Sequence, residues 1–408
     1  MYKYRFSLLL LVSVVVLASV SLRAQEVEDT IRIKTRVVFL DALVKDRRTN
    51  LPISNLTQEN FEVLDNGQPR EISYFTREGQ TRKPLALVII LDLREDGAGR
   101  FLKEEEILKS MENELAKLPP GDEVAIMAMN IGEDEQRVWL SEFTNDRAKI
   151  AEALKKVQAI CLKNEAPKPP DNVAQTAENT AKETAKPKEV VSTEVNKGRN
   201  GSVVTRKTMS DGSVDVTRVS KNGKMSIELG EVYDMAAAVR EATRKTQELR
   251  PNSQMSLVWV SDGIAPIFFE DRDATAEIIT RDNVIFNSLT VELRTLFKFL
   301  LPIGRPIAGW MGMSLYGSAK QLAQRSGGEA VKVNRVKDYG AGLSRIIGNL
   351  TARYSLGFTL AENETDDGRL HHLEVRVKAP DEKGKKRKLQ VSSRQGYYMA
   401  YPPITQNQ

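Results

Sequence analysis

Apolar positions along this chain fall into two repeating patterns, buried strands and one-sided helices. The clearest strand is Leu85–Asp92, whose sequence is Leu-Ala-Leu-Val-Ile-Ile-Leu-Asp. A continuous aliphatic strand of this length predicts burial on both faces, as in a parallel sheet covered by helices. The same criteria predict strands at 123–130, 136–143, 254–261, 283–293 and 329–333, and helices at 102–118, 145–160, 231–249, 315–325 and 339–352. This alternation predicts a doubly wound, Rossmann-like α/β domain over residues 84–353.

The segments on either side of this domain have the shorter period of β structure. Residues 31–80 alternate imperfectly in steps of two, and Asp65-Asn66-Gly67 is a hairpin turn signal. Residues 354–398 return to strands separated by polar turns. We expect the two segments to form one all-β, Ig-like sandwich into which the α/β domain is inserted. Two separate small β units are the alternative.

Residues 163–228 interrupt the α/β pattern and are predicted to be an insertion in a loop. From Asn164 to Arg199 the chain is rich in Ala, Pro, Lys, Glu and Thr and has almost no large apolar residues, so we expect disorder there. Residues 202–228 contain short alternating pieces that predict an exposed β-ribbon.

The N-terminus has the features of an export signal. Lys3 and Arg5 precede an apolar run, and Ala24 supplies a small residue for cleavage, so we expect residues 1–24 to be a signal peptide. An uncleaved anchor is the alternative. No later segment is long and apolar enough to be an expected membrane span.

Composition narrows the class of protein. Hydrophobic residues make up 41% of the 408 residues and charged residues 28%, as expected for globular domains. Removal of residues 1–24 lowers the formal net charge from +5 to +2, which argues against a nucleic-acid partner. The one cysteine, Cys161, excludes an internal disulfide, and two adjacent histidines, His371 and His372, make a Ser-His-Asp site implausible.

Three separated segments resemble a known family. The strand ending in Asp92, a later strand ending in Ser261-Asp262-Gly263 and the α/β order between them resemble a von Willebrand factor A (VWA) domain. The segment VVFLDALVKDRRTNLPISNLTQENFEVLDNGQPREISYF and the later YSLGFTL and RQGYY resemble the flanking parts of a VWA-related family common in Acidobacteria. The resemblance implies a metal-ion-dependent adhesion site at the carboxyl ends of the strands, built from Asp-x-Ser-x-Ser, a Thr and an Asp, which binds Mg²⁺.

This sequence keeps that adhesion site only in part. Asp92 and Asp262 stand at the two Asp positions, but Arg94 and Asp96 replace the two Ser residues, and the Thr loop around Glu231 has no Thr. A guanidinium beside the metal position repels a cation and pairs with carboxylates, so we expect Arg94 to pair with Asp92 or Asp262 and no metal to bind. The alternative is a rebuilt Mg²⁺ or Ca²⁺ site using Asp92, Asp96 and Asp262, with Glu231 as a further candidate ligand.

A second candidate site is the apolar stretch from Phe297 to Met313. Loops at the carboxyl ends of strands bind ligands in open α/β sheets, and Trp and Met suit adaptable protein contacts. We therefore expect partner contacts from Phe299, Trp310, Met311 and Met313. Packing of this stretch on the domain's own core is the alternative. An acidic group at Asp271, Asp273, Glu277 and Asp282 is expected to be a solvated helix face.

Together these features predict an exported, non-catalytic protein-binding module without a cofactor. It would act in the periplasm, at the cell surface or outside the cell. A metal-dependent hydrolase, or the regulatory subunit of one, is the alternative, and a structural envelope protein is a third reading. The sequence identifies neither the partner nor the oligomeric state.

Overall fold

The structure is a computed structural model, and it describes most of the chain from residue 36 to residue 399. The described ranges are 36–77, 82–94, 98–129, 137–164, 189–198, 201–210, 214–223, 226–229, 235–291, 306–333, 335–364, 367–380 and 387–399. The expected signal peptide at residues 1–24 lies outside them.

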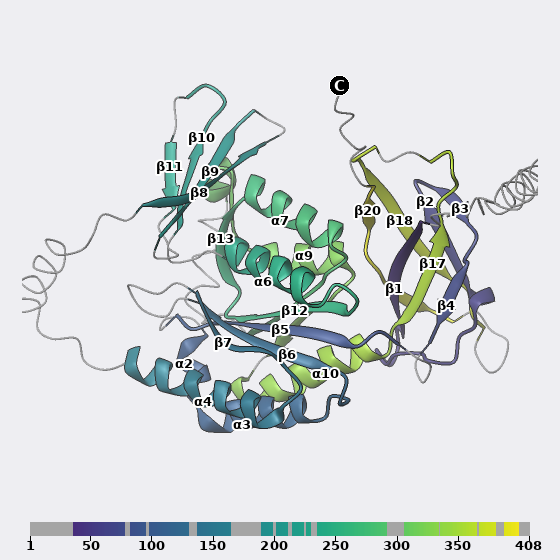
Figure 1. The fold of residues 1–408 in the computed structure, drawn as a ribbon, viewed down its shortest axis with the longest axis horizontal. Coiled ribbons are helices and arrows are strands. Elements are labelled where there is room, and N and C mark those ends of the chain that lie inside the picture. Colours follow the sequence, from purple (N-terminus) through teal and green to yellow (C-terminus); the bar gives the residue numbers. More distant parts are fainter. Residues whose placement is uncertain are drawn as a thin grey trace, which may run out of the picture. The chain divides into compact units, whose positions relative to one another are not determined.

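A six-stranded sheet forms the centre of the α/β domain (Figure 1). Its order is β16-β14-β12-β5-β6-β7. All neighbours are parallel except β6 and β7, which are antiparallel. The strands are β5 (Leu85–Asp92), β6 (Glu123–Met129), β7 (Arg137–Thr144), β12 (Gln254–Ser261), β14 (Ile285–Val291) and β16 (Ala330–Val333).

Successive residues of β5 face two different cores, and all eight are buried. Leu87 and Ile89 join one apolar cluster, whereas Val88 and Ile90 join another, because side chains alternate across a strand. The prediction of a strand buried on both faces of a doubly wound sheet is therefore confirmed.

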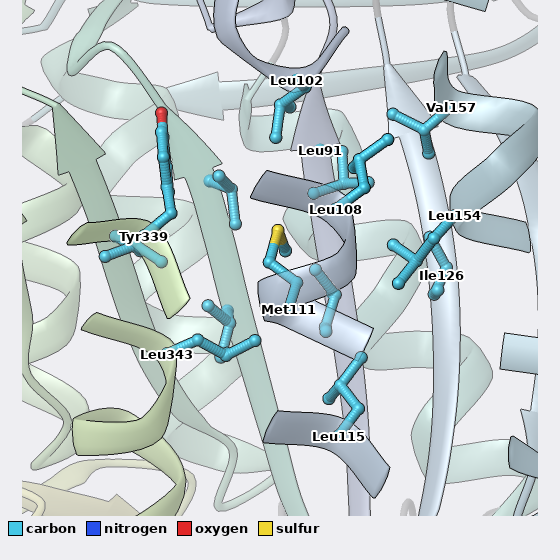
Figure 2. Close-up of a cluster of buried hydrophobic side chains, with 14 of the residues drawn as sticks. Leu91, Leu102, Leu108, Met111, Leu115, Ile126, Leu154, Val157, Tyr339 and Leu343 are labelled. Atoms are coloured by element: carbon cyan, nitrogen blue, oxygen red, sulfur yellow. The ribbon is translucent and has the colours of Figure 1, made fainter. Parts of the chain in front are cut away.

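Helices cover both faces of this sheet. The first layer contains α2 (Gly99–Leu102), α3 (Glu105–Ala116), α4 (Arg147–Asn164) and α10 (Tyr339–Thr351), which follows the short 3-10 turn η3 (Val336–Asp338). Figure 2 shows the core of this layer, where Met111 of α3 and Leu343 of α10 lie in front of the sheet. The second layer contains α6 (Met235–Leu249), α7 (Phe269–Arg281) and α9 (Ser318–Ser326).

Two smaller sheets accompany the α/β domain. β13 (Ile264–Phe268) and β15 (Met313–Tyr316) form an antiparallel pair. The insertion forms a four-stranded sheet in the order β11-β10-β9-β8 (teal in Figure 1), which we call the ribbon. Its strands are β8 (Val190–Lys197), β9 (Val203–Met209), β10 (Val214–Val219) and β11 (Ser226–Leu229).

The ribbon corrects two expectations from the sequence. β8 forms over residues that we expected to be disordered. Its order comes from pairing with β9, which lies further along the chain, and not from its own composition. The ribbon is also not fully exposed, since Val204 and Val216 pack with Phe268, Ala308 and Met313.

The two flanking segments share one apolar core. One four-stranded sheet has the order β19-β1-β17-β4 and the other β20-β18-β2-β3, and each contains strands from both ends of the chain. The strands are β1 (Val37–Asp46), β2 (Phe61–Asp65), β3 (Gln68–Arg70), β4 (Tyr74–Thr76), β17 (Tyr354–Thr359), β18 (Leu370–Val377), β19 (Leu389–Ser392) and β20 (Gly396–Tyr398), with one 3-10 turn, η1 (Gln58–Asn60). The described parts of the two segments thus contain eight strands.

Two local features shape this β unit, and the first of them was predicted. Asn66 and Gly67 have positive φ angles of 49° and 83° in the β2–β3 hairpin, as a tight two-residue turn requires. Thr57 and Asn60 form a capping box around η1. Within the described ranges, no helix has the length and hydropathy needed to cross a membrane.

Candidate functional site

Two aspartates meet where the central strands β5 and β12 end. The strands are parallel neighbours, with Val260 opposite Leu91. Asp92 is the last residue of β5, and Asp262 directly follows β12. Their carboxylates therefore lie at the same edge of the sheet, where ligands of open α/β sheets usually bind.

Arg94 lies between these two carboxylates and bonds to both. Its Nη2 donates to Asp92 Oδ2 at 2.7 Å and to Asp262 Oδ1 at 2.9 Å, and its Nε donates to Asp92 Oδ1 at 3.0 Å. The same Nη2 lies 2.8 Å from the backbone carbonyl oxygen of Ile264. This is the contact that the sequence predicted, and it makes a forked, charge-assisted pair with Asp92.

The turn after β12 holds the carboxylates in place. Ser261 Oγ donates to Asp92 Oδ2 at 2.9 Å, and the backbone N–H of Ile264 donates to Asp262 Oδ1 at 3.0 Å. Gly263 has a φ angle of +88°, which a residue with a side chain rarely adopts. The Ser-Asp-Gly sequence thus fixes both the oxygen positions and the sharp turn.

This cluster is shut off from solvent. The side chains of Arg94, Asp92 and Asp262 are 5%, 1% and 4% exposed. Burial raises the pKa of the Asp262 carboxyl, and the charge of Arg94 opposes part of that rise. The guanidinium of Arg94 therefore bonds to two buried carboxylates, and Arg100 adds a second positive charge that acts on Asp262. The stability of such a cluster depends on keeping its paired charges.

Tyr339 of α10 lies beside the same cluster. Its side chain is fully buried, and burial together with the negative charge of Asp262 raises the pKa of its phenol. In Figure 2 its hydroxyl points away from Leu343. The hydroxyl has no hydrogen-bond partner among the described residues.

These residues do not fit a divalent cation in this arrangement. Mg²⁺ and Ca²⁺ need several oxygen ligands that are free to coordinate. Here Arg94 Nη2 lies within hydrogen-bond distance of both carboxylates, and a cation between them would meet that positive charge at close range. Among the described residues, no group of three or more acidic, His or Cys side chains is arranged to hold a metal. Asp96 and Glu231, which the rebuilt site would use, lie outside the described residues.

The apolar stretch before β15 divides into an exposed and a buried part. Residues 306–310 are helical, and Trp310 and Ile307 on this turn are 75% and 58% exposed. Met313, expected at a partner surface, is instead 7% exposed and packs against the ribbon, because its strand faces that core. Met311 is partly buried on the same cluster, and Phe299 lies outside the described residues.

A second buried ionic cluster, which joins the ribbon to α6 and α7, was missed in the sequence. Asp271 of α7 accepts hydrogen bonds from Arg206 of β9 at 2.8 Å and from Arg240 of α6 at 2.8 Å. Asp271 is 1% exposed, so the expectation of a solvated acidic face is wrong for this residue. Asp273 of the same group is exposed.

Glu270 forms the neighbouring contact with Arg218 of β10. Burial would raise the pKa of Glu270, but hydrogen bonds from Arg218 and Ser202 outweigh it and hold the pKa below its ordinary value. Gly312 allows the close approach, since a side chain there would collide with the guanidinium of Arg218. One signal in the sequence pointed to this contact between the ribbon and the helices α6 and α7. That signal was an arginine at each of positions 206 and 218, on the inward side of the predicted strands.

Comparison with known proteins gives similarity at the level of structure alone. No protein family and no curated protein sequence matches this chain. Among solved structures, the SpRpn10 VWA domain has a TM-score of 0.32 at 11% identity, over 65% of this chain and 94% of that chain. Manganese-loaded TRAP protein from Plasmodium vivax has a TM-score of 0.31 at 11% identity, over 83% of this chain and 97% of that one.

The pilus adhesin SpaC from Lactobacillus rhamnosus GG has a TM-score of 0.34 at 8% identity, over 83% of this chain. This chain covers 46% of the adhesin's length. Similarity at this level does not establish a family for the chain.

Proposed function

We propose that this chain is an exported VWA-like module that binds a protein partner, and that its adhesion site is degenerate and works without a metal ion. The observation that carries the proposal is the position of Arg94, which bonds to both Asp92 and Asp262. A built-in cation at this position removes the open coordination site through which a metal would bind a partner's carboxylate. Recognition would then depend on protein surfaces alone.

Burial of this cluster also argues against an enzyme. Metal-assisted hydrolysis needs a site that admits both water and substrate. Asp92, Arg94 and Asp262 are each at most 6% exposed. We therefore prefer the binding module to a hydrolase or its regulatory subunit.

The best candidate for the recognition surface is the helical turn at residues 306–310. Trp310 is the most exposed of the large apolar side chains in the described part of the chain, and Ile307 lies one turn before it. Exposed aromatic side chains are common at the centres of protein interfaces. The buried side of the same turn, through Ala308, packs on the ribbon and gives it a firm base.

Three further parts of the proposal rest on the sequence. Residues 1–24 would direct export to the periplasm, the cell surface or the exterior. The flanking β unit would be Ig-like, and the chain would belong to the VWA-related family found in Acidobacteria. No nucleic acid or membrane span is part of the proposed mature protein.

Calorimetric titration with Mg²⁺, Ca²⁺ and Mn²⁺ tests the metal-free site. We expect no binding by the natural chain. Arg94→Ser, which restores a hydroxyl at the position of the family's first Ser, is the matched variant and is expected to gain weak binding if it folds. Tight binding by the natural chain that is lost in Asp262→Ala would overturn the proposal.

Cross-linking followed by mass spectrometry tests the recognition surface in the envelope of the source cells. Trp310→Ala is expected to lose a specific cross-linked partner that the natural chain retains in the presence of EDTA. Leu51→Ala is the control, because Leu51 is 64% exposed on the β unit. A partner that is lost with EDTA and kept by Trp310→Ala contradicts the surface and the metal-free site together.

A further inference from the structure

Among the described strands, β8 is an edge strand of the ribbon. β8 pairs with β9, and no other described strand pairs with it. An edge strand offers a row of backbone N–H and C=O groups to any further strand. Natural proteins usually shorten or charge such an edge, so its side chains show how far it is protected.

The side chains of β8 protect this edge poorly. Val190, Val191 and Val195 are 50%, 68% and 54% exposed, which places three of the large exposed apolar side chains on one strand. Glu194 and Asn196 point the other way, since they bond to Arg240 and Asp271 of the α/β domain. Val191 and Val195 are therefore held outward by a strand whose opposite face is fixed, whereas Val190 lies at the shift in register with β9.

The backbone of β8 alternates in the same way. The N–H of Gly198 donates to the carbonyl of Ser202 at 2.8 Å, so the even-numbered residues back to Ser192 direct their backbone groups toward β9. The register with β9 shifts between Val190 and Ser192, and beyond the shift the carbonyl of Glu189 accepts from the N–H of Ser210 at 2.8 Å. Thr193, Val195 and Lys197 consequently direct theirs to the free side. A new strand could bond there without breaking the bonds between β8 and β9.

We propose that the occupant of this edge is β8 of a second copy of the chain, paired antiparallel about a two-fold axis at Thr193. The two ribbons then form one continuous sheet, and the chain is a dimer. This interaction surface is separate from the turn at residues 306–310 and does not depend on the proposed function.

Self-complementarity selects this register. Pairing centred on Thr193 places Val191 of one copy opposite Val195 of the other, twice. Glu189 lies just beyond the register shift, so it is not directly opposite Lys197, but these opposite charges of the two copies come to the same end of the paired strands, at both ends. Apolar and opposite-charge pairs across strands stabilise a sheet by roughly 0.2–1 kcal/mol each. Centring on Glu194 instead places two glutamates opposite each other, and centring on Val195 places Thr193 opposite Lys197.

Sedimentation equilibrium of the full chain tests the dimer. We expect a reversible dimer that the double variant Val191→Lys, Val195→Lys weakens by about tenfold or more, because lysines then face lysines. The double variant Val191→Lys, Val195→Glu is the matched control and should restore the dimer, since each lysine then faces a glutamate of the second copy. Thr217→Lys, on the outer side of β10 and away from the edge, should leave it unchanged.

Disulfide formation tests the register. Thr193→Cys is expected to give a covalent dimer under mild oxidation, because residues in a bonded antiparallel pair have Cα atoms about 5.5 Å apart. Thr217→Cys should not, and the natural Cys161 is buried. A chain that stays monomeric at all concentrations overturns the proposal, as does a dimer that Val195→Cys cross-links but Thr193→Cys does not. A dimer equally stable in both charge variants overturns it as well.

Discussion

At the scale of single residues, the cluster around Arg94 combines burial, opposite charges and convergent hydrogen bonds. Two carboxylates share one guanidinium, and the nearest hydroxyl and backbone N–H groups point to the same oxygens. Each polar group in the cluster depends on its neighbours because water cannot replace a lost partner there. The cost of a substitution therefore depends on which charge it leaves behind.

Arg94→Met should be among the more destabilising single changes in the α/β domain. It leaves Asp92 and Asp262 buried without their cation, which typically costs about 3–5 kcal/mol. Urea unfolding followed by circular dichroism measures the effect. Arg325→Met is the control, since its pair with Asp273 is half exposed and is expected to contribute about 0–1 kcal/mol. Equal small effects for both variants would contradict the buried pairing.

Tyr339→Phe should leave stability unchanged or raise it by about 1 kcal/mol. The phenol hydroxyl is buried without a partner among the described residues, so its removal relieves an uncompensated desolvation cost. The same unfolding experiment measures it, with Tyr354→Phe as the control. Tyr354 OH donates to the carbonyl oxygen of Ile53 at 2.7 Å, so that change should destabilise. A larger loss at Tyr339 than at Tyr354 would show that its hydroxyl is bonded.

At the scale of elements, buried strands and tight turns were predictable, and docking contacts were not. The aliphatic run of β5 and the Asn66-Gly67 turn each carry their signal within a few residues. The pairing of Arg94 with Asp92 was also predictable, because the two residues are close in sequence. Asp271 was misassigned because its partners, Arg206 and Arg240, lie on β9 and α6, and their approach depends on the folded chain. β8 was missed because it is ordered by β9 and not by its own composition.

The attachment of the β17–β18 loop to β3 should depend on pH. Glu364 accepts a hydrogen bond from Arg70 of β3, which lowers the pKa of Glu364 below its ordinary value of 4.5. A lowered pKa in the folded chain means that the pair stabilises the fold above pH 4.5 and loses that effect as the pH falls through the folded-state value. Glu364→Gln is therefore expected to lose about 0.5–1 kcal/mol at pH 7 and progressively less below pH 4.5.

Unfolding curves measured at a series of pH values check this prediction. Glu362→Gln changes an exposed acidic residue of the same loop and is the control. The prediction fails if the difference between the natural chain and Glu364→Gln stays constant from pH 7 to pH 3.

At the scale of the whole molecule, the two ends of the chain form one β unit. Ala42 of β1 lies opposite Tyr354 of β17, and Val63 of β2 lies opposite Val375 of β18. Phe61 and Tyr354 pack at a tilt of 54° in the shared core, with ring centroids 4.9 Å apart. Neither segment can bury its apolar face without the other. The period-two patterns before and after the α/β domain therefore described a single β unit.

A chain that ends at residue 353 should therefore keep the α/β sheet and lose the β unit. The core side chains of β1 and β2 become exposed to water, so we expect binding of a hydrophobic dye and aggregation. A separate peptide covering residues 354–399 is the matched control and should suppress both by completing the sheets. A truncated chain that stays soluble and binds no dye would contradict a shared core.

The pairing of β1 with β17 also has a consequence during synthesis. β1 emerges from the ribosome about 300 residues before its partner, an interval of roughly 15 s to a minute at ordinary translation rates. Throughout this interval β1 lacks its native strand partners, β17 and β19, and an unpaired strand can join other chains. A nascent chain of this design needs a chaperone, or a channel that keeps it extended, until its last strands arrive.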